Sequence, residues 1–127
     1  MANRNWGNAH FSNLQSPVRI DFQWTELAGT PLQVHRGRFV TSVTRTAAGL
    51  YSVVFPDIFT QLYGVSGIVV GVLAAVDQYV QVAAYNAAAA GGATLDLRIK
   101  TAGAQADPAD GDEVFIETIW SNSQLNP

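Results

Sequence analysis

The chain has 127 residues, no cysteine and a net charge of −3, and only 13% of its residues are charged. An ordinary soluble domain has about 25% charged residues, so we expect other protein to cover much of this surface, as in a subunit of an assembly. The negative charge argues against a nucleic-acid backbone as the main partner, and the lack of cysteine excludes disulfides and thiolate metal sites.

The N-terminal residues 1–17 are polar and rich in asparagine, with no apolar segment of the kind that a signal peptide has. Asparagine favours turns and loops, yet Trp6 and Phe11 are large aromatic groups. We predict an extended arm with two aromatic anchors. A frayed tail is the alternative, since termini are often loosely held.

The next segments predict antiparallel strands. Residues 18–24 alternate between apolar and polar side chains, which indicates a half-buried strand. Residues 38–45 and 50–55 are rich in β-forming residues around a short connection at residues 46–49, which predicts a hairpin. Pro56 cannot donate a hydrogen bond to a neighbouring strand and should end the second one.

The second half of the chain continues this pattern. Residues 57–62 suggest a turn or a short helix, and residues 67–75 suggest a strand without alternation, with both faces covered. The apolar run at residues 65–76 is shorter than the roughly 20 residues of a membrane helix, so we expect no membrane partner. Further strands are predicted over residues 32–34, 79–86, 95–100 and 113–120.

These elements predict an all-β fold with about seven or eight strands and a turn every 8–12 residues. We expect an antiparallel β-sandwich or jelly roll over residues 18–120, an extended arm at residues 1–17 and a polar tail at residues 121–127. A small barrel is the alternative architecture.

The acidic segment at residues 107–113 is the candidate for chemistry. Asp107, Asp110 and Asp112 are close in sequence, and hard cations prefer several carboxylates on one loop. Calcium is therefore a candidate ligand, although the spacing of an EF-hand is missing. The alternative is a turn with solvated charges, and on that interpretation the chain has no metal and no cofactor.

No other pattern predicts catalysis. His10 and His35 have no second ligand at a metal-binding spacing, and no serine stands in a Gly-x-Ser-x-Gly elbow. We name no catalytic residue and expect the protein not to be an enzyme. Trp24 and Trp120 could stack on sugars, but they end apolar strands and are expected to pack in the core or at an interface.

The region 37–120 combines a β-hairpin with an acidic turn before the last strand. The residues that form this pattern are Arg45, Thr46, Gly49, Tyr51, Val53, Phe55, Asp110, Gly111 and Asp112. With this pattern, the region resembles small jelly-roll structural proteins of tailed bacteriophages.

The resemblance implies two functions. The first is a capsid decoration, or cement, protein: a homotrimer on the outer surface of the virion that bridges and stabilises major capsid subunits. The alternative is a receptor- or glycan-binding head domain of a phage head or tail fibre. A small β-barrel enzyme is a third hypothesis, weakened by the lack of convergent titratable groups.

The contacts of a decoration protein can be assigned to two segments. The arm residues Trp6 and Phe11 are expected to touch the capsid. Asp77 is the one charged residue between Ile58 and Leu95, so this stretch is expected to hold the interface between subunits. The residues predicted at that interface are Ile68, Val69, Val70, Val72 and Leu73.

Overall fold

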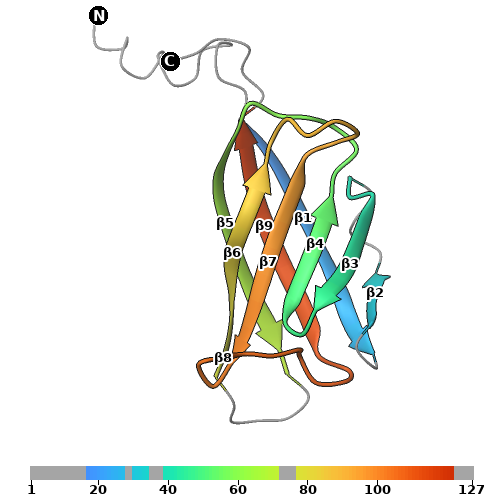
Figure 1. The fold of residues 1–127 in the computed structure, drawn as a ribbon, viewed down its shortest axis with the longest axis vertical. Coiled ribbons are helices and arrows are strands. Elements are labelled where there is room, and N and C mark those ends of the chain that lie inside the picture. Colours follow the sequence, from blue (N-terminus) through green and yellow to red (C-terminus); the bar gives the residue numbers. More distant parts are fainter. Residues whose placement is uncertain (1–16, 28–29, 35–38, 72–76, 122–127) are drawn as a thin grey trace, which may run out of the picture.

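The computed structural model describes residues 17–27, 30–34, 39–71 and 77–121, which form two antiparallel sheets packed face to face (Figure 1). The strands are β1 (Pro17–Leu27), β2 (Thr30–Val34), β3 (Ser42–Ala47), β4 (Leu50–Val54), β5 (Gln61–Val70), β6 (Gln78–Asn86), β7 (Thr94–Thr101), β8 (Ala104–Gln105) and β9 (Glu113–Ser121). One sheet has the order β2-β1-β9-β5, and the other has the order β3-β4-β7-β6 with β8 paired to β7. The predicted β-sandwich is confirmed.

The first and last strands of the sandwich are neighbours. β1 pairs with β9 from Pro17↔Ser121 to Thr25↔Glu113, so both strands are central in their sheet. The predicted boundaries are short by a few residues, because Pro17 and Ser121 belong to the sheet and β1 continues to Leu27. The predicted arm and tail otherwise lie outside the described residues.

The predicted hairpin is confirmed as β3 and β4. The connection is tighter than expected, since β3 continues to Ala47 and pairs with Leu50 at the turn. Gly49 has a φ of 73°, in the left-handed region that favours glycine. β4 ends at Val54, just before Phe55 and Pro56.

The prediction for the next segments was right in part. Residues 57–60 form a bend rather than a helix, which agrees with the turn alternative, but β5 already begins at Gln61. β5 also has one outward face instead of two covered faces, because Ile68 and Val70 are exposed while Val65 and Val69 pack on the core. Ser66 stands on the outward face as well, but the apolar residues on both sides of the strand hide this alternation.

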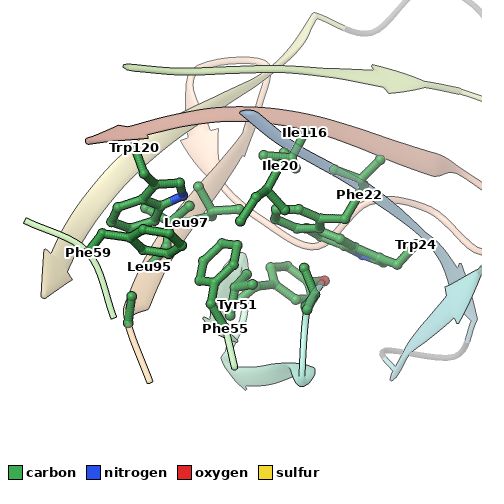
Figure 2. Close-up of a cluster of buried hydrophobic side chains, with 14 of the residues drawn as sticks. Ile20, Phe22, Trp24, Tyr51, Phe55, Phe59, Leu95, Leu97, Ile116 and Trp120 are labelled. Carbon is green, nitrogen blue, oxygen red and sulfur yellow. The ribbon is translucent and has the colours of Figure 1, made fainter. Parts of the chain in front are cut away.

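The core between the sheets is aromatic in its centre and aliphatic along β7 (Figure 2). Leu95, Leu97 and Ile99 point inward from β7 and are fully buried, as their alternation predicted. Trp120 stacks on Phe59 with ring centroids 4.9 Å apart, and Trp24 lies 5.1 Å from Tyr51. Both tryptophans are fully buried, so they hold the two sheets together and cannot form a sugar platform.

Candidate interaction surfaces

The most unusual surface of the described residues lies on β5 and β6. These two strands contain no charged residue. Six of the ten exposed large hydrophobic side chains in the described part of the chain belong to them. The six are Tyr63, Ile68 and Val70 on β5, and Tyr79, Val82 and Tyr85 on β6. We call this set the β5–β6 surface.

The two strands meet because they close one edge of the sandwich. β5 is the outermost strand of one sheet and β6 of the other, and they run side by side (Figure 1). A Cβ on Gly67 would lie 3.2 Å from Cβ of Val80, so the absence of a side chain at Gly67 lets β6 approach β5 closely. The β5–β6 surface therefore lies along one edge of the molecule, with Ile68 on the outer face of one sheet and Tyr79 on the outer face of the other.

Edge strands expose unpaired backbone groups, and soluble proteins usually protect them with charges, prolines or bulges. Each of these strands has one bulge, between Leu62 and Gly64 on β5 and between Val82 and Ala84 on β6. Neither strand has a charge or a proline. An uncharged, apolar edge of this kind is typical of a surface that another protein covers.

The predicted interface residues divide into three groups. Ile68 and Val70 point outward and are 61% and 48% exposed, which makes them available to a partner. Val69 is half-buried and packs on the core instead. Val72 and Leu73 lie outside the described residues, as do Trp6, Phe11, His10 and His35. The exposed tyrosines and Val82 of β6 were not predicted, although the lack of charge around them was visible in the sequence.

A second surface feature is a groove at the end of the sandwich where β1 begins and β9 ends. Its volume is about 580 Å³, and residues 18–20, Phe39 and residues 57–59 line it. Phe39 and Ile58 are 55% and 57% exposed at its walls. We call it the terminal groove; no sequence pattern pointed to it, because its walls come from three separate segments.

The charges in the terminal groove are not equivalent. Arg19 is neutralised by its ion pairs with Asp21 (3.1 Å) and with Glu117 of β9 (3.0 Å). The hydrogen bond with Asp21 raises the pKa of Arg19. Asp57 is exposed and takes part in none of the three ion pairs found among the described residues. Asp57 is thus the uncompensated charge of the groove.

A polar cluster closes the opposite end of the sandwich. Glu26 is fully buried at the end of β1, where one carboxylate oxygen, Oε1, accepts a hydrogen bond from Nε1 of Trp24 (3.3 Å). The other, Oε2, has no partner among the described residues. Burial raises the pKa of Glu26, and the adjacent hydroxyl of Tyr51 and the indole of Trp24 only partly offset this.

Asp107 stands on the other side of the Tyr51 hydroxyl. Partial burial alone would raise the pKa of Asp107, but hydrogen bonds from Arg45 and from the Gly49 amide hold it below its usual value. Burial, followed by the charge of Glu26, raises the pKa of the Tyr51 phenol. The two carboxyl groups therefore have opposite pKa shifts, but Glu26 has no solvent-exposed surface for a substrate to approach.

The three calcium candidates do not form one site. Asp107 faces the β3–β4 hairpin, whereas Asp112 is buried and accepts a hydrogen bond from the Ala109 amide (2.9 Å). Asp110 is exposed. Within the described ranges, no three histidine or acidic residues are grouped so that they could hold a metal ion. The acidic segment folds into a structural turn, which packs against β1 through Glu26.

Compared with family models, curated proteins and solved structures, the chain has no significant match. Among the described residues, no helix has the length and apolar character needed to cross a membrane. The β5–β6 surface and the terminal groove are therefore the candidate functional features of the described residues.

Proposed function

We propose that this chain is a structural subunit of a tailed-bacteriophage virion: a capsid decoration protein that binds the outer shell as a trimer and bridges major capsid subunits. The observation that carries the proposal is the β5–β6 surface. Its six exposed apolar side chains and the absence of charge on both strands favour contact with protein over contact with water.

The expected mechanism is mechanical. Burial of apolar surface against a neighbour contributes about 25 cal/mol per Å², and part of this is offset by the loss of freedom on association. Ile68 and Val70 are suited to such burial because their strand is already fixed by pairing with β9. Many copies acting together would then resist the outward pressure of packaged DNA.

A rigid sandwich suits this task. The fully buried Trp24 and Trp120 connect the two sheets at opposite ends of β1, and the first and last strands pair along nearly their whole length. Force applied to β5 or β6 would be transmitted to their partners β9 and β7, which are inner strands of the two sheets, rather than to a loop. Trp6 and Phe11, which precede the described residues, remain the predicted additional contacts with the shell or a neighbouring subunit.

The test combines native mass with shell binding. Light scattering at two concentrations should show a species three times the chain mass of 13.6 kDa. The protein should also cosediment with shells assembled from the major capsid protein of the same phage. Ile68→Asp should lower both the trimer mass and the cosedimentation, because it would bury a charge at the interface.

Leu27→Asp is the matched control, since Leu27 is also an exposed apolar residue (49%) but lies at the end of β1, away from β5 and β6. It should leave mass and shell binding unchanged. A chain that is monomeric at both concentrations and does not cosediment with shells would contradict the proposed function.

A further inference from the structure

We infer that the terminal groove is a docking site for the N-terminal segment, residues 1–16, of a second copy of this chain. The inference extends the proposed function, which supplies the neighbouring copies, by naming the partner of the segment. It is carried by the groove's shape, its uncompensated charge and the place where the segment joins the sandwich.

The groove and the segment have complementary chemistry. The groove exposes Phe39 and Ile58, and its uncompensated charge is the carboxylate of Asp57. The segment contains Trp6 and Phe11, a cation at Arg4, and no aspartate or glutamate. Its two aromatic rings match the apolar walls, and the guanidinium of Arg4 matches the carboxylate of Asp57.

The position of the segment favours a neighbouring copy. Residues 1–16 lead directly into Pro17, and residues 18–20 are already a wall of the groove. The residue before a proline is biased away from the helical region toward extended backbone. Sixteen extended residues span up to about 50 Å, more than the roughly 37 Å of the 11-residue β1, so the segment can reach another molecule.

The C-terminal residues 122–127 are the competing occupant, because β9 ends beside the start of β1 (Figure 1). They contain Leu125 but no aromatic ring and no cationic side chain. Nothing in them would neutralise Asp57. The N-terminal segment is therefore the better match. Each copy would then donate its N-terminal segment to one neighbour and receive a segment from another in its own groove. Such head-to-tail contacts can close into a ring such as a trimer.

The experiment uses two full-length variants whose defects are complementary. The segment variant carries Trp6→Ala and Phe11→Ala. The groove variant carries Ile58→Lys, which places a cation where Arg4 should bind; Ile58 is 57% exposed, so the sandwich should tolerate it. Both variants also carry Ile68→Asp, so that the β5–β6 surface does not contribute to association.

Two signals are measured: sedimentation mass, and quenching of tryptophan fluorescence by acrylamide. Trp24 and Trp120 are fully buried, so quenching reports mainly on Trp6, which the groove variant retains. Each variant alone should be monomeric, and Trp6 should be readily quenched in the groove variant. Mixing should produce a heteromer and reduce the quenching several-fold, because intact segments then meet intact grooves.

The controls separate this contact from others. A groove variant that also carries Asn5→Ala and Asn8→Ala should still form the heteromer when mixed with the segment variant. A groove variant that also carries Trp6→Ala and Phe11→Ala should not. A variant that carries Ile119→Lys instead of Ile58→Lys should keep a functional groove, because Ile119 is exposed and lies outside the groove.

Three outcomes would overturn the inference. The first is no heteromer and no change in quenching on mixing. The second is a Trp6 that is protected in the Ile68→Asp chain at every dilution without association, which would place the segment on its own chain. The third is loss of the heteromer on deletion of residues 122–127. None of them contradicts the proposed function, which is tested by trimer mass and shell binding of the unmodified chain.

Discussion

The carboxylate of Asp107 accepts a 2.7 Å hydrogen bond from the backbone amide of Gly49, a residue 58 positions earlier in the chain. The same carboxylate binds Arg45 at 2.9 Å and accepts a hydrogen bond from the Tyr51 hydroxyl at 3.3 Å. One side chain in the acidic segment thus fixes the turn of the β3–β4 hairpin from outside. Both of its carboxylate oxygens are thus engaged in contacts that hold this turn.

Asp107→Ala should destabilise the sandwich. It would leave the Gly49 amide and the buried Tyr51 hydroxyl without this partner, and a polar group left unsatisfied typically costs about 1–3 kcal/mol. Urea unfolding would measure the loss. Asp77→Ala is the control, because Asp77 is exposed and, among the described residues, its recorded hydrogen bond is the one that its backbone carbonyl accepts from the Ala102 amide. Equal stability of the two variants would contradict the assigned role.

The sequence predicted the hairpin but not the carboxylate that holds it. Gly49 and the β-forming residues around it are local signals, so a hairpin could be inferred from adjacent residues alone. Asp107 belongs to a different segment, and its sequence neighbours Asp110 and Asp112 suggested a cation site. Only the folded chain shows that Asp107 turns toward Arg45 while Asp112 turns toward Ala109.

Gly92 should tolerate no side chain, in contrast to its neighbour Gly91. Gly92 has a φ of 126°, and a Cβ there would collide with the backbone carbonyl of Phe55. Gly91 has a φ of 90°, but a Cβ would meet nothing within 4 Å. We expect Gly91→Ala to cost about 1 kcal/mol from backbone strain, and Gly92→Ala to cost about 3 kcal/mol, at the upper end of common single substitutions.

Denaturant unfolding of both glycine variants would check this difference. The turn also supports the terminal groove, because the adjacent Ala93 amide donates to the carbonyl of Asp57 (2.9 Å). Gly92→Ala should therefore weaken association through the groove as well, whereas Gly91→Ala should not. Comparable unfolding free energies for the two variants would show that the turn adapts and does not position Asp57.

The β5–β6 surface marks the second limit of sequence-based prediction. The lack of charge around Ile68 correctly indicated an unusual surface, since charge is a property of composition and needs no fold. The direction in which each side chain points was harder to predict from the sequence. Val69 and Val70 are both valines, and only the pairing of β5 with β9 shows that the first faces the core and the second faces out.

Glu26 should make stability fall as pH rises. Its pKa is raised in the folded chain by burial, so its favourable contribution is fully present below its unfolded pKa of about 4.3 and is lost as pH increases through the folded value. Asp107, with a lowered pKa, acts in the opposite sense: its contribution is present above an unfolded pKa of about 3.9 and is lost as pH falls through the folded value.

Glu26→Gln separates the two effects. The amide keeps an oxygen that can accept from the Trp24 indole but cannot ionise, so the variant should gain stability relative to the natural chain as pH rises from about 4. The gain at neutral pH should be about 1–2 kcal/mol, within the range for a buried group left unsatisfied. Unfolding free energies across pH 3–8 would measure it, and a difference that does not vary with pH would contradict the role of Glu26.

Thr118 should be needed for its hydroxyl rather than for its shape. It is fully buried in β9, accepts a hydrogen bond from the Trp120 indole (3.0 Å) and donates one to the carbonyl of Ile20 (2.8 Å). Thr118→Val keeps the volume but leaves the indole N–H and the carbonyl without this partner, at a cost of about 1–3 kcal/mol. Thr118→Ser retains both bonds and loses one methyl group, for which about 1 kcal/mol is expected. The melting temperature should thus be highest for the natural chain, lower for Thr118→Ser and lowest for Thr118→Val. If Thr118→Val were the more stable of the two variants, the methyl group would contribute more to the core than the hydrogen bonds do.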